Sequence, residues 1–338
     1  GTATDDVSAV DSVEVAIFSP DSSVWWHNGS WNPGIYWNKA TGTANWNYTN
    51  TPGIGVGDIY WVIARSYDAT GKVSDPDTNK FVFDNVQPIT SITSPVNSTI
   101  YNASPSFAGT STDPASGIRV VEVKICNTTD SLFWDGVSWT GAPVIDTATG
   151  TATWNYTMPS LTNGKSYSVT SRAIDSAGNT SSFVTDIIFS IDATAPSATL
   201  SSSAPATVGS TPFSVTVDFS EPVSSFTLAN ITVVNGTKTN LVNTMTDQQW
   251  TFDVTPTADG AVSIDIPAAA VNDFGSNPNT ASNTLSRTAD MTPPVSAVTT
   301  PVPGSSVANV SFVGGTASDA NGITLVQLAI IDTTTGNY

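Results

Sequence analysis

The sequence predicts an all-β protein, built as tandem antiparallel β-sandwiches in an elongated array. Three observations predict it. The phrase ATGTANWNYT, which begins at Ala40, returns as ATGTATWNYT at Ala148, 108 residues later. Charged residues make up only 11% of the chain, well below the usual quarter, while Thr and Val, which suit half-buried strands, are frequent. No stretch shows the apolar period of an amphipathic helix.

The repeated phrase belongs to a longer repeat. WHNGSW is matched by WDGVSW, and VIARSYDATG is matched by VTSRAIDSAG, at nearly the same spacing. A Gly-Thr opening occurs three times, as GTATDD, GTSTDP and GTASDA, at Gly1, Gly109 and Gly315. A fixed period of roughly one hundred residues indicates one folding unit written several times.

Four units follow from this period. Their expected bounds are 1–88, with the first strand missing, 89–195, 196–293, which is of a different subtype, and 294–338, which is an N-terminal half. A half sandwich leaves strand edges open. Either the chain is a piece of a longer array, or a neighbouring chain completes the half domains and the protein is the subunit of a self-assembling filament.

Unit 2 shows the expected strands most clearly. Alternating apolar residues predict strands at SFAGTST, IRVVEVKIC, TATWNYTM, YSVTSRAI and SFVTDIIFSI, and turn residues predict breaks at DPASG, LTNGK and DSAGN. Many short strands within a hundred residues favour an antiparallel sandwich.

These motifs carry a family resemblance. SRAIDSAGN, DATAP and GTSTDPASGIRVVEVKI resemble the bacterial and archaeal immunoglobulin-like and fibronectin-III-like tandem repeats of large surface proteins. The third unit, from VDFSEPVSSFTLANITVVNG to SNTLSRTAD, is similar to a bacterial immunoglobulin-like repeat of large adhesins. The resemblance implies immunoglobulin-like sandwiches at the cell surface, outside the cell, which serve mostly as spacers.

Acidic residues recur at two places in each unit. One lies in a late turn and the other closes the unit, and a strand between them places the two at opposite poles. The closing Asp of one unit should therefore meet the late-turn and opening-turn acids of the next. The expected clusters are Asp84, Asp113 and Asp175; Asp192, Asp273 and either Asp218 or Glu221; Asp290 and Asp319; and Asp5, Asp6 and Asp68, which would face a further unit.

Three carboxylates at one junction repel each other unless a cation lies between them. Ca²⁺ takes six to eight oxygen ligands and is the candidate cofactor, since it would clamp each linker into a rod. The alternative is that each Asp caps its own turn. The formal net charge of −18 excludes a nucleic-acid footprint, and no apolar run is long enough to cross a membrane.

The tryptophans raise a second possibility. Trp26, Trp31, Trp134 and Trp139 lie in matching hairpins, where exposed indoles would form a patch for surface glycans or a partner. The alternative is packing, which is also expected for Trp46 and Trp154 of the repeated phrase, because a sandwich buries large aromatic residues in its core.

The primary hypothesis is a structural segment of an extracellular surface protein: a stalk, fibre or adhesin extender, with neighbouring repeats or like subunits as partners. A glycan-binding or partner-binding module and a filament subunit are the alternatives. Catalysis is not expected, because His27 is the single histidine and Cys126 the single cysteine, which leaves no zinc set.

Overall fold

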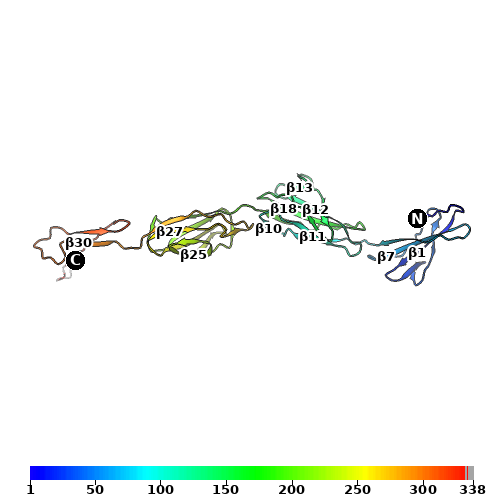
Figure 1. Ribbon diagram of the computed structural model, residues 1–338, viewed down its shortest axis with the longest axis horizontal. Coiled ribbons are helices and arrows are strands. Elements are labelled where there is room, and N and C mark those ends of the chain that lie inside the picture. The colour runs from blue at the N-terminus through cyan, green and yellow to red at the C-terminus, as the bar shows by residue number, and fades with distance from the viewer. Residues whose placement is uncertain (332, 334–338) are drawn as a thin grey trace. The chain divides into compact units, whose positions relative to one another are not determined.

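The computed structural model describes residues 1–331 and 333 (Figure 1). It divides into two compact units, Gly1–Asp192 and the chain from Ala193 onward, and each is described by itself. Strands account for nearly all the regular structure, as predicted; within the described residues one 3₁₀ turn, η1 (Leu228–Asn230), is the exception. The four predicted units are called repeats 1 to 4, and their boundaries stay a prediction.

Repeat 1 is organised around a sheet with the order β3-β2-β1-β7-β8, in which β4 also pairs with β1. Gly1 and Ala3 bond to the backbone of Ala44–Trp46 and begin the opposite layer. The strands are β1 (Val10–Ser19), β2 (Val24–His27), β3 (Ser30–Asn32), β4 (Asn38–Lys39), β5 (Thr41–Gly42), β6 (Trp46–Asn47), β7 (Ile59–Asp68) and β8 (Asp77–Val82).

Repeat 2 has two sheets, one ordered β10-β19-β18-β12-β13-β14, with β15 on β12, and one ordered β16-β17-β11-β9. Trp154 of the repeated phrase is fully buried between them, as the packing interpretation of that phrase predicts. The strands are β9 (Ile89–Ser94), β10 (Thr99–Tyr101), β11 (Phe107–Thr112), β12 (Ile118–Asn127), β13 (Leu132–Trp134), β14 (Trp139–Thr140), β15 (Asp146–Thr147), β16 (Thr149–Gly150), β17 (Thr153–Tyr156), β18 (Ser166–Asp175) and β19 (Ile187–Ile191).

The two repeats share their central strand pair. β1 pairs antiparallel with β7, and β12 pairs antiparallel with β18. The cross-strand ion pair Glu14–Arg65 (2.7 Å) in repeat 1 returns as Glu122–Arg172 (2.6 Å) in repeat 2. The sequence repeat is therefore also a repeat of strand register.

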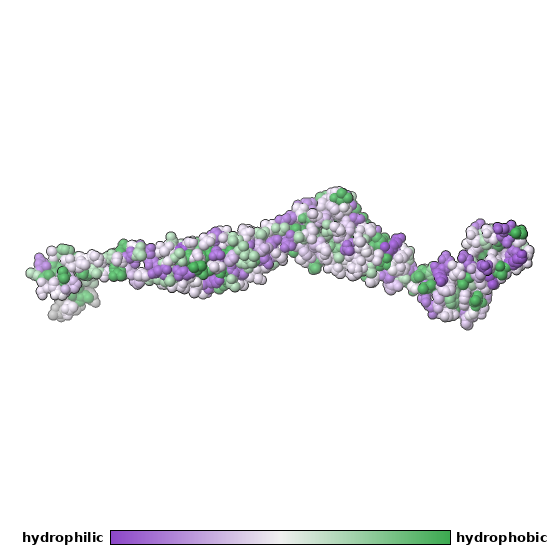
Figure 2. Space-filling view, viewed as in Figure 1, coloured by the Kyte–Doolittle hydropathy of each residue, from purple (hydrophilic) through white to green (hydrophobic). Residues whose placement is uncertain are grey.

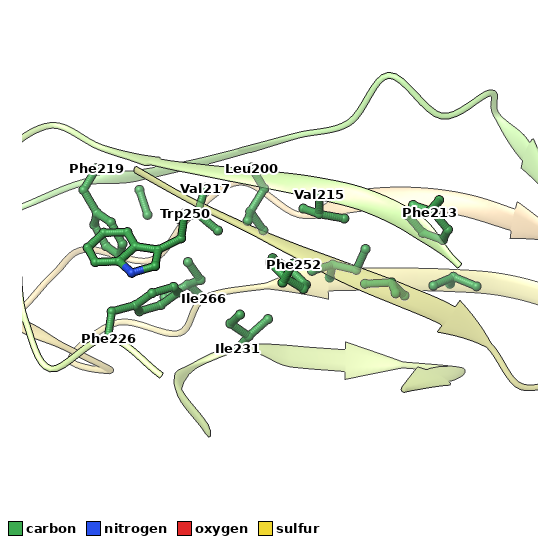
Figure 3. Packing of buried hydrophobic residues seen from close by; sticks show 14 of the residues in the cluster. Leu200, Phe213, Val215, Val217, Phe219, Phe226, Ile231, Trp250, Phe252 and Ile266 are labelled. Atoms are coloured by element: carbon green, nitrogen blue, oxygen red, sulfur yellow. The ribbon is translucent and has the colours of Figure 1, made fainter. Parts of the chain in front are cut away.

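The second compact unit begins with another two-layer sandwich, with sheets ordered β20-β22-β26-β25 and β21-β29-β27-β24. Figure 3 shows Phe219, Phe226 and Trp250 gathered at one end of its core, with Phe219 edge-on to Trp250. The strands are β20 (Ala198–Ser201), β21 (Thr207–Val208), β22 (Phe213–Phe219), β23 (Val223–Ser224), β24 (Thr232–Val234), β25 (Gly236–Met245), β26 (Gln249–Pro256), β27 (Gly260–Asp265), β28 (Asn272–Asp273) and β29 (Leu285–Ala289).

Repeat 4 is described as one hairpin, β30 (Val295–Thr300) and β31 (Gly314–Ser318). Six residues of this predicted unit, 332 and 334–338, lie outside the described residues. On the visible face of each unit, apolar residues are interspersed with polar ones (Figure 2). No helix in the described part of the chain has the length and apolar character needed to span a bilayer.

Candidate functional site

The acids predicted for the first junction come together. Asp84 follows β8, Asp113 follows β11, and Asp175 ends β18. Each offers a carboxylate oxygen, and these three oxygens lie within 4.8 Å of one another. Asp84 and Asp175 are buried, and Asp113 is half-buried.

Asp113 is held by its own turn. Its Oδ1 accepts hydrogen bonds from the backbone N–H groups of Ala115, Ser116 and Gly117 at 3.1, 2.8 and 3.2 Å. Gly117 has φ +75°, a conformation that costs glycine little. This turn leaves Oδ2 buried and without a hydrogen-bond partner in the described structure. A buried acceptor in that state is costly unless a proton or a cation reaches it.

Asp175 is also oriented by a turn. Its Oδ1 accepts from the N–H groups of Gly178 (2.7 Å) and Asn179 (2.8 Å). The Asn179 side-chain amide donates to Asp175 Oδ2 at 2.8 Å and to the Asp84 backbone oxygen at 3.2 Å. Asn179 therefore ties the late turn of repeat 2 to the closing residue of repeat 1.

Asp84 is the carboxylate that the other repeat contributes. Its Oδ2 accepts from the Ser116 hydroxyl at 2.5 Å, and its Oδ1 accepts from the Val86 N–H at 2.9 Å. The Ser116 hydrogen bond, followed by that of Val86, lowers the pKa of Asp84 below its ordinary value. The group is therefore an anion at neutral pH, which is the state a hard cation binds.

The geometry of the three carboxylates is compatible with both predicted roles. Each caps a turn through one oxygen, and one oxygen of each lies within 4.8 Å of those of the other two. Close, buried like charges disfavour the ionised state unless a positive charge compensates them. The oxygen-only donor set and the unpartnered Oδ2 of Asp113 fit Ca²⁺, with backbone carbonyls and water to complete its shell.

In the second compact unit, Asp273 and Glu221 offer oxygens within 4.8 Å of each other. Asp273 lies in a turn of the same kind: Asn277 donates its N–H to Oδ1 and its side-chain amide to Oδ2, both at 2.8 Å. Of the two predicted alternatives, Glu221 lies with Asp273. Asp218 is exposed and accepts from the Gln249 amide at 2.6 Å. Asp192, the last residue of the first compact unit, stays a predicted third ligand.

In two further predicted clusters the acids are brought together only in part. Asp290 Oδ2 accepts from the side-chain amide of Asn321 at 2.5 Å, while the Asn321 N–H donates to Asp319 at 2.8 Å, so Asn321 links these two acids. At the start of the chain, Asp5 and Asp68 line one shallow cavity of about 310 Å³. Asp6 is exposed, and it is not among the residues that line this cavity.

The tryptophans predicted to bind glycans pack in their hairpins. Trp26 is 7% exposed, belongs to the core of repeat 1, and donates its indole N–H to the Asn50 oxygen at 2.6 Å. Trp31 packs against it edge-on, with ring centroids 5.5 Å apart. Trp134 and Trp139 pack on each other at 5.5 Å and against the core of repeat 2. This geometry favours the packing alternative, and glycan binding stays a prediction.

Sequence reasoning missed the supporting residues. Ser116 and Asn179 hold the first junction together, yet neither is acidic. A usable signal existed for Asn179: the turns DSAGN and DFGSN both place an Asn four residues after the Asp. The turn DATGK has Lys72 at that place instead.

Comparisons with known proteins find a family model and solved structures that are similar to the chain. Residues 192–289 match the family model of the bacterial Ig-like domain. Among solved structures, the Escherichia coli adhesin FdeC is similar, with 11% identity and a TM-score of 0.42, over 86% of this chain and 87% of that one.

Two further solved structures are similar to the chain at lower TM-scores. A tetra-tandem repeat from the extending region of a large adhesion protein has 18% identity and a TM-score of 0.28, over 88% of this chain and 71% of that one. The FN1–FN3 domains of chicken CNTN1 have 12% identity and a TM-score of 0.28, over 85% of this chain and 91% of that one. A comparison with the curated proteins finds no match. The chain is therefore an all-β protein whose residues 192–289 match the bacterial Ig-like domain.

Proposed function

We propose that this chain is a structural repeat segment of an extracellular surface protein, and that Ca²⁺ at its first repeat junction stiffens it. The observation that carries the proposal is the meeting of Asp84, from one repeat, with Asp113 and Asp175, from the next. A cation bound there joins the two repeats through charge. The protein would act as a stalk or adhesin extender.

The surface location is part of the proposal. The match of residues 192–289 to the bacterial Ig-like domain supports it. Because such repeats carry no chemistry of their own, reach and stiffness are the properties that selection can act on. A junction that stiffens only with calcium would make that reach depend on the calcium outside the cell.

The test compares thermal unfolding and small-angle scattering of the full chain in calcium and in chelator. A ligand at one hundred times its Kd stabilises the folded state by about 2.7 kcal/mol, or roughly 5–10 °C for a unit of this size. We expect that rise in calcium, together with a less flexible particle. Magnesium is the metal control.

The variant for this test is the pair Asp84→Asn and Asp175→Asn, which should remove the calcium response. The matched control is Asp135→Asn. Asp135 caps a turn in repeat 2 by accepting from the N–H groups of Val137 and Ser138, and it lies outside the cluster. A chain whose melting and scattering are the same in calcium and chelator would sink the proposal.

A further inference from the structure

One row of side chains crosses the large sheet of repeat 1 from strand to strand. Phe18 of β1 lies opposite Trp25 of β2 on one side and opposite Trp61 of β7 on the other. At one end of the row, Trp25 lies opposite Asn32 of β3. At the other end, Trp61 lies opposite Lys80 of β8. Three aromatic residues on adjacent strands therefore form one row, with an amide at one end and an ammonium at the other.

The three rings lie on the outer face of the sheet. Their neighbours along the chain belong to the core of repeat 1 or pack against it: Ile17, Trp26 and Val62. Since successive side chains of a strand point to opposite faces, the rings point away from that core. All three are half-buried. The solvent face of an antiparallel sheet is commonly polar, so an aromatic row there requires an explanation.

The rings contact one another across the strands. The ring centroids of Phe18 and Trp25 are 4.5 Å apart with planes tilted by 31°, and those of Phe18 and Trp61 are 5.6 Å apart in an edge-on arrangement. Cross-strand aromatic pairs of this kind stabilise a sheet. This pairing explains why the rings lie together, but it does not explain the cation at the end of the row.

Lys80 gives the row its charge. Its Nζ lies 4.0 Å from the centroid of the Trp61 ring, which is a cation–π contact. Lys80 is exposed, and its ammonium forms no ion pair among the residues that the structure describes. Arg65, which lies on the same face of β7 as Trp61, differs because it pairs with Glu14 at 2.7 Å. Lys80 therefore presents a positive charge beside the aromatic rings.

Repeat 2 has the same row without these properties. Its members, in the same strand order, are Thr140, Phe133, Cys126, Ser168 and Ile188. One of them is aromatic and none is charged. Repeat 2 forms the corresponding sheet without an aromatic row, so the sheet itself does not require one. The row is a property of repeat 1 and not of the repeated fold.

We propose that this row binds an acidic oligosaccharide, a sugar chain that carries carboxylates of the uronic acid type. The C–H groups on the flat face of a pyranose ring meet the negative faces of Trp25 and Phe18. A carboxylate of the same chain pairs with the Lys80 ammonium. The hydroxyl groups stay in water, because the site is a face and not a cavity. This interaction goes beyond the proposed function and does not use the calcium site.

Charge complementarity selects an acidic sugar over a neutral one. The row itself carries one positive charge, on a chain whose formal net charge is −18. At physiological ionic strength the screening length is about 8 Å, so carboxylates farther away than this repel an anionic sugar only weakly. Lys80 acts at contact distance, where screening is small. Short oligosaccharides at physiological ionic strength are therefore the ligands to measure.

The experiment titrates the full chain with trimers of galacturonic, glucuronic and mannuronic acid and follows tryptophan fluorescence. Chelator is present throughout, because calcium could bridge a uronate to the carboxylates of the protein. A neutral trimer of galactose is the matched ligand. We expect at least one acidic trimer to bind about tenfold more tightly than the neutral one.

Two variants test the two halves of the row. Lys80→Gln should abolish the preference for the acidic trimer, and it should leave the melting temperature unchanged because the residue is exposed. Trp25→Ala should weaken binding about tenfold or more. Lys124→Gln is the matched control, since Lys124 also lies over an aromatic ring, that of Phe183 in repeat 2, at 5.2 Å. If Trp25→Ala does not fold, Lys80→Gln still decides.

Three results would overturn the proposal. One is that no acidic trimer binds at concentrations up to about 10 mM. Another is binding that Lys80→Gln leaves unchanged. The third is self-association of the chain through the row, seen by light scattering as dimers that Trp25→Ala abolishes. Loss of the calcium response with sugar binding intact would instead count against the proposed function alone.

Discussion

The opening poles of repeats 1 and 2 carry the same acidic turns in different surroundings. Asp68 and Asp175 both end a long strand, and each accepts backbone N–H groups from the turn that follows. Asp5 and Asp113 likewise cap the opening turn. At the pole of repeat 2, Asp84 arrives from the preceding repeat, and Asp175 is 0% exposed. In the described chain the pole of repeat 1 receives no such residue.

The difference separates turn formation from cation binding. Both poles form their turns, and in each the Asp at the end of the long strand accepts backbone N–H groups of the turn that follows. The pole of repeat 2 adds a third carboxylate, and it has Asn179 where repeat 1 has Lys72. Burial and charge, which accumulate only at a junction, are what distinguish a candidate ion site from an ordinary turn.

The largest expected effect comes from deleting the buried carboxylate. Asp175→Ala leaves three hydrogen-bond donors without their acceptor, and we expect it to lower the free energy of unfolding by about 3 kcal/mol in chelator. Asp68→Ala, at the more exposed pole, should cost clearly less. Urea unfolding of the full chain, followed by tryptophan fluorescence, measures both. Equal losses in the free energy of unfolding for the two variants would contradict the difference between the two poles.

The second-largest effect is expected from exchanging Asn179 and Lys72, the residues that differ between the two turns. Asn179→Lys places an ammonium group among the three carboxylates, where it should act as a built-in cation. We expect the melting temperature in chelator to hold and the rise on adding calcium to disappear. The reciprocal change, Lys72→Asn, should create no calcium response because the third carboxylate is lacking. Retention of the full response by Asn179→Lys would show that the ion, if bound, lies elsewhere.

The smallest expected effect is on how the melting temperature falls at acid pH. Hydrogen bonds from Ser116 and then Val86 lower the pKa of Asp84, so its ionised form favours the folded state. That contribution is complete above the ordinary value of 3.8 and is lost as the pH falls through the lower folded-state value. In chelator, Asp84→Asn should therefore flatten the fall in melting temperature below pH 4. A curve parallel to that of the unaltered chain would contradict this assignment.

The all-β fold was predictable because its signals are local. The repeated phrase located the buried Trp154, and the turns DPASG, LTNGK and DSAGN fall between strands as expected. The predicted strand SFVTDIIFSI was too long. Its second half forms β19, while its first half lies outside any strand, and the Val184 N–H bonds to the Ser171 oxygen. Alternation alone could not show where pairing stops.

The site was predictable only in part. Periodicity placed Asp84, Asp113 and Asp175 at one junction, since it fixes which strand ends share a pole. It could not choose between Asp218 and Glu221, because they lie three residues apart at the end of one strand. It also missed the non-local roles of Ser116 and Asn179, which depend on contacts between repeats.

The parallel pairs β10·β19 and β21·β29 determine how a sandwich resists tension. The chain enters each sandwich near the first strand of the pair and leaves through the second, so a pull at both ends slides the two strands past each other. Their hydrogen bonds then share the load instead of opening one after another. Repeat 2 pairs three residues there and the sandwich of the second compact unit pairs two. Under a steadily rising force, the second should therefore rupture first, giving an array whose parts yield in sequence.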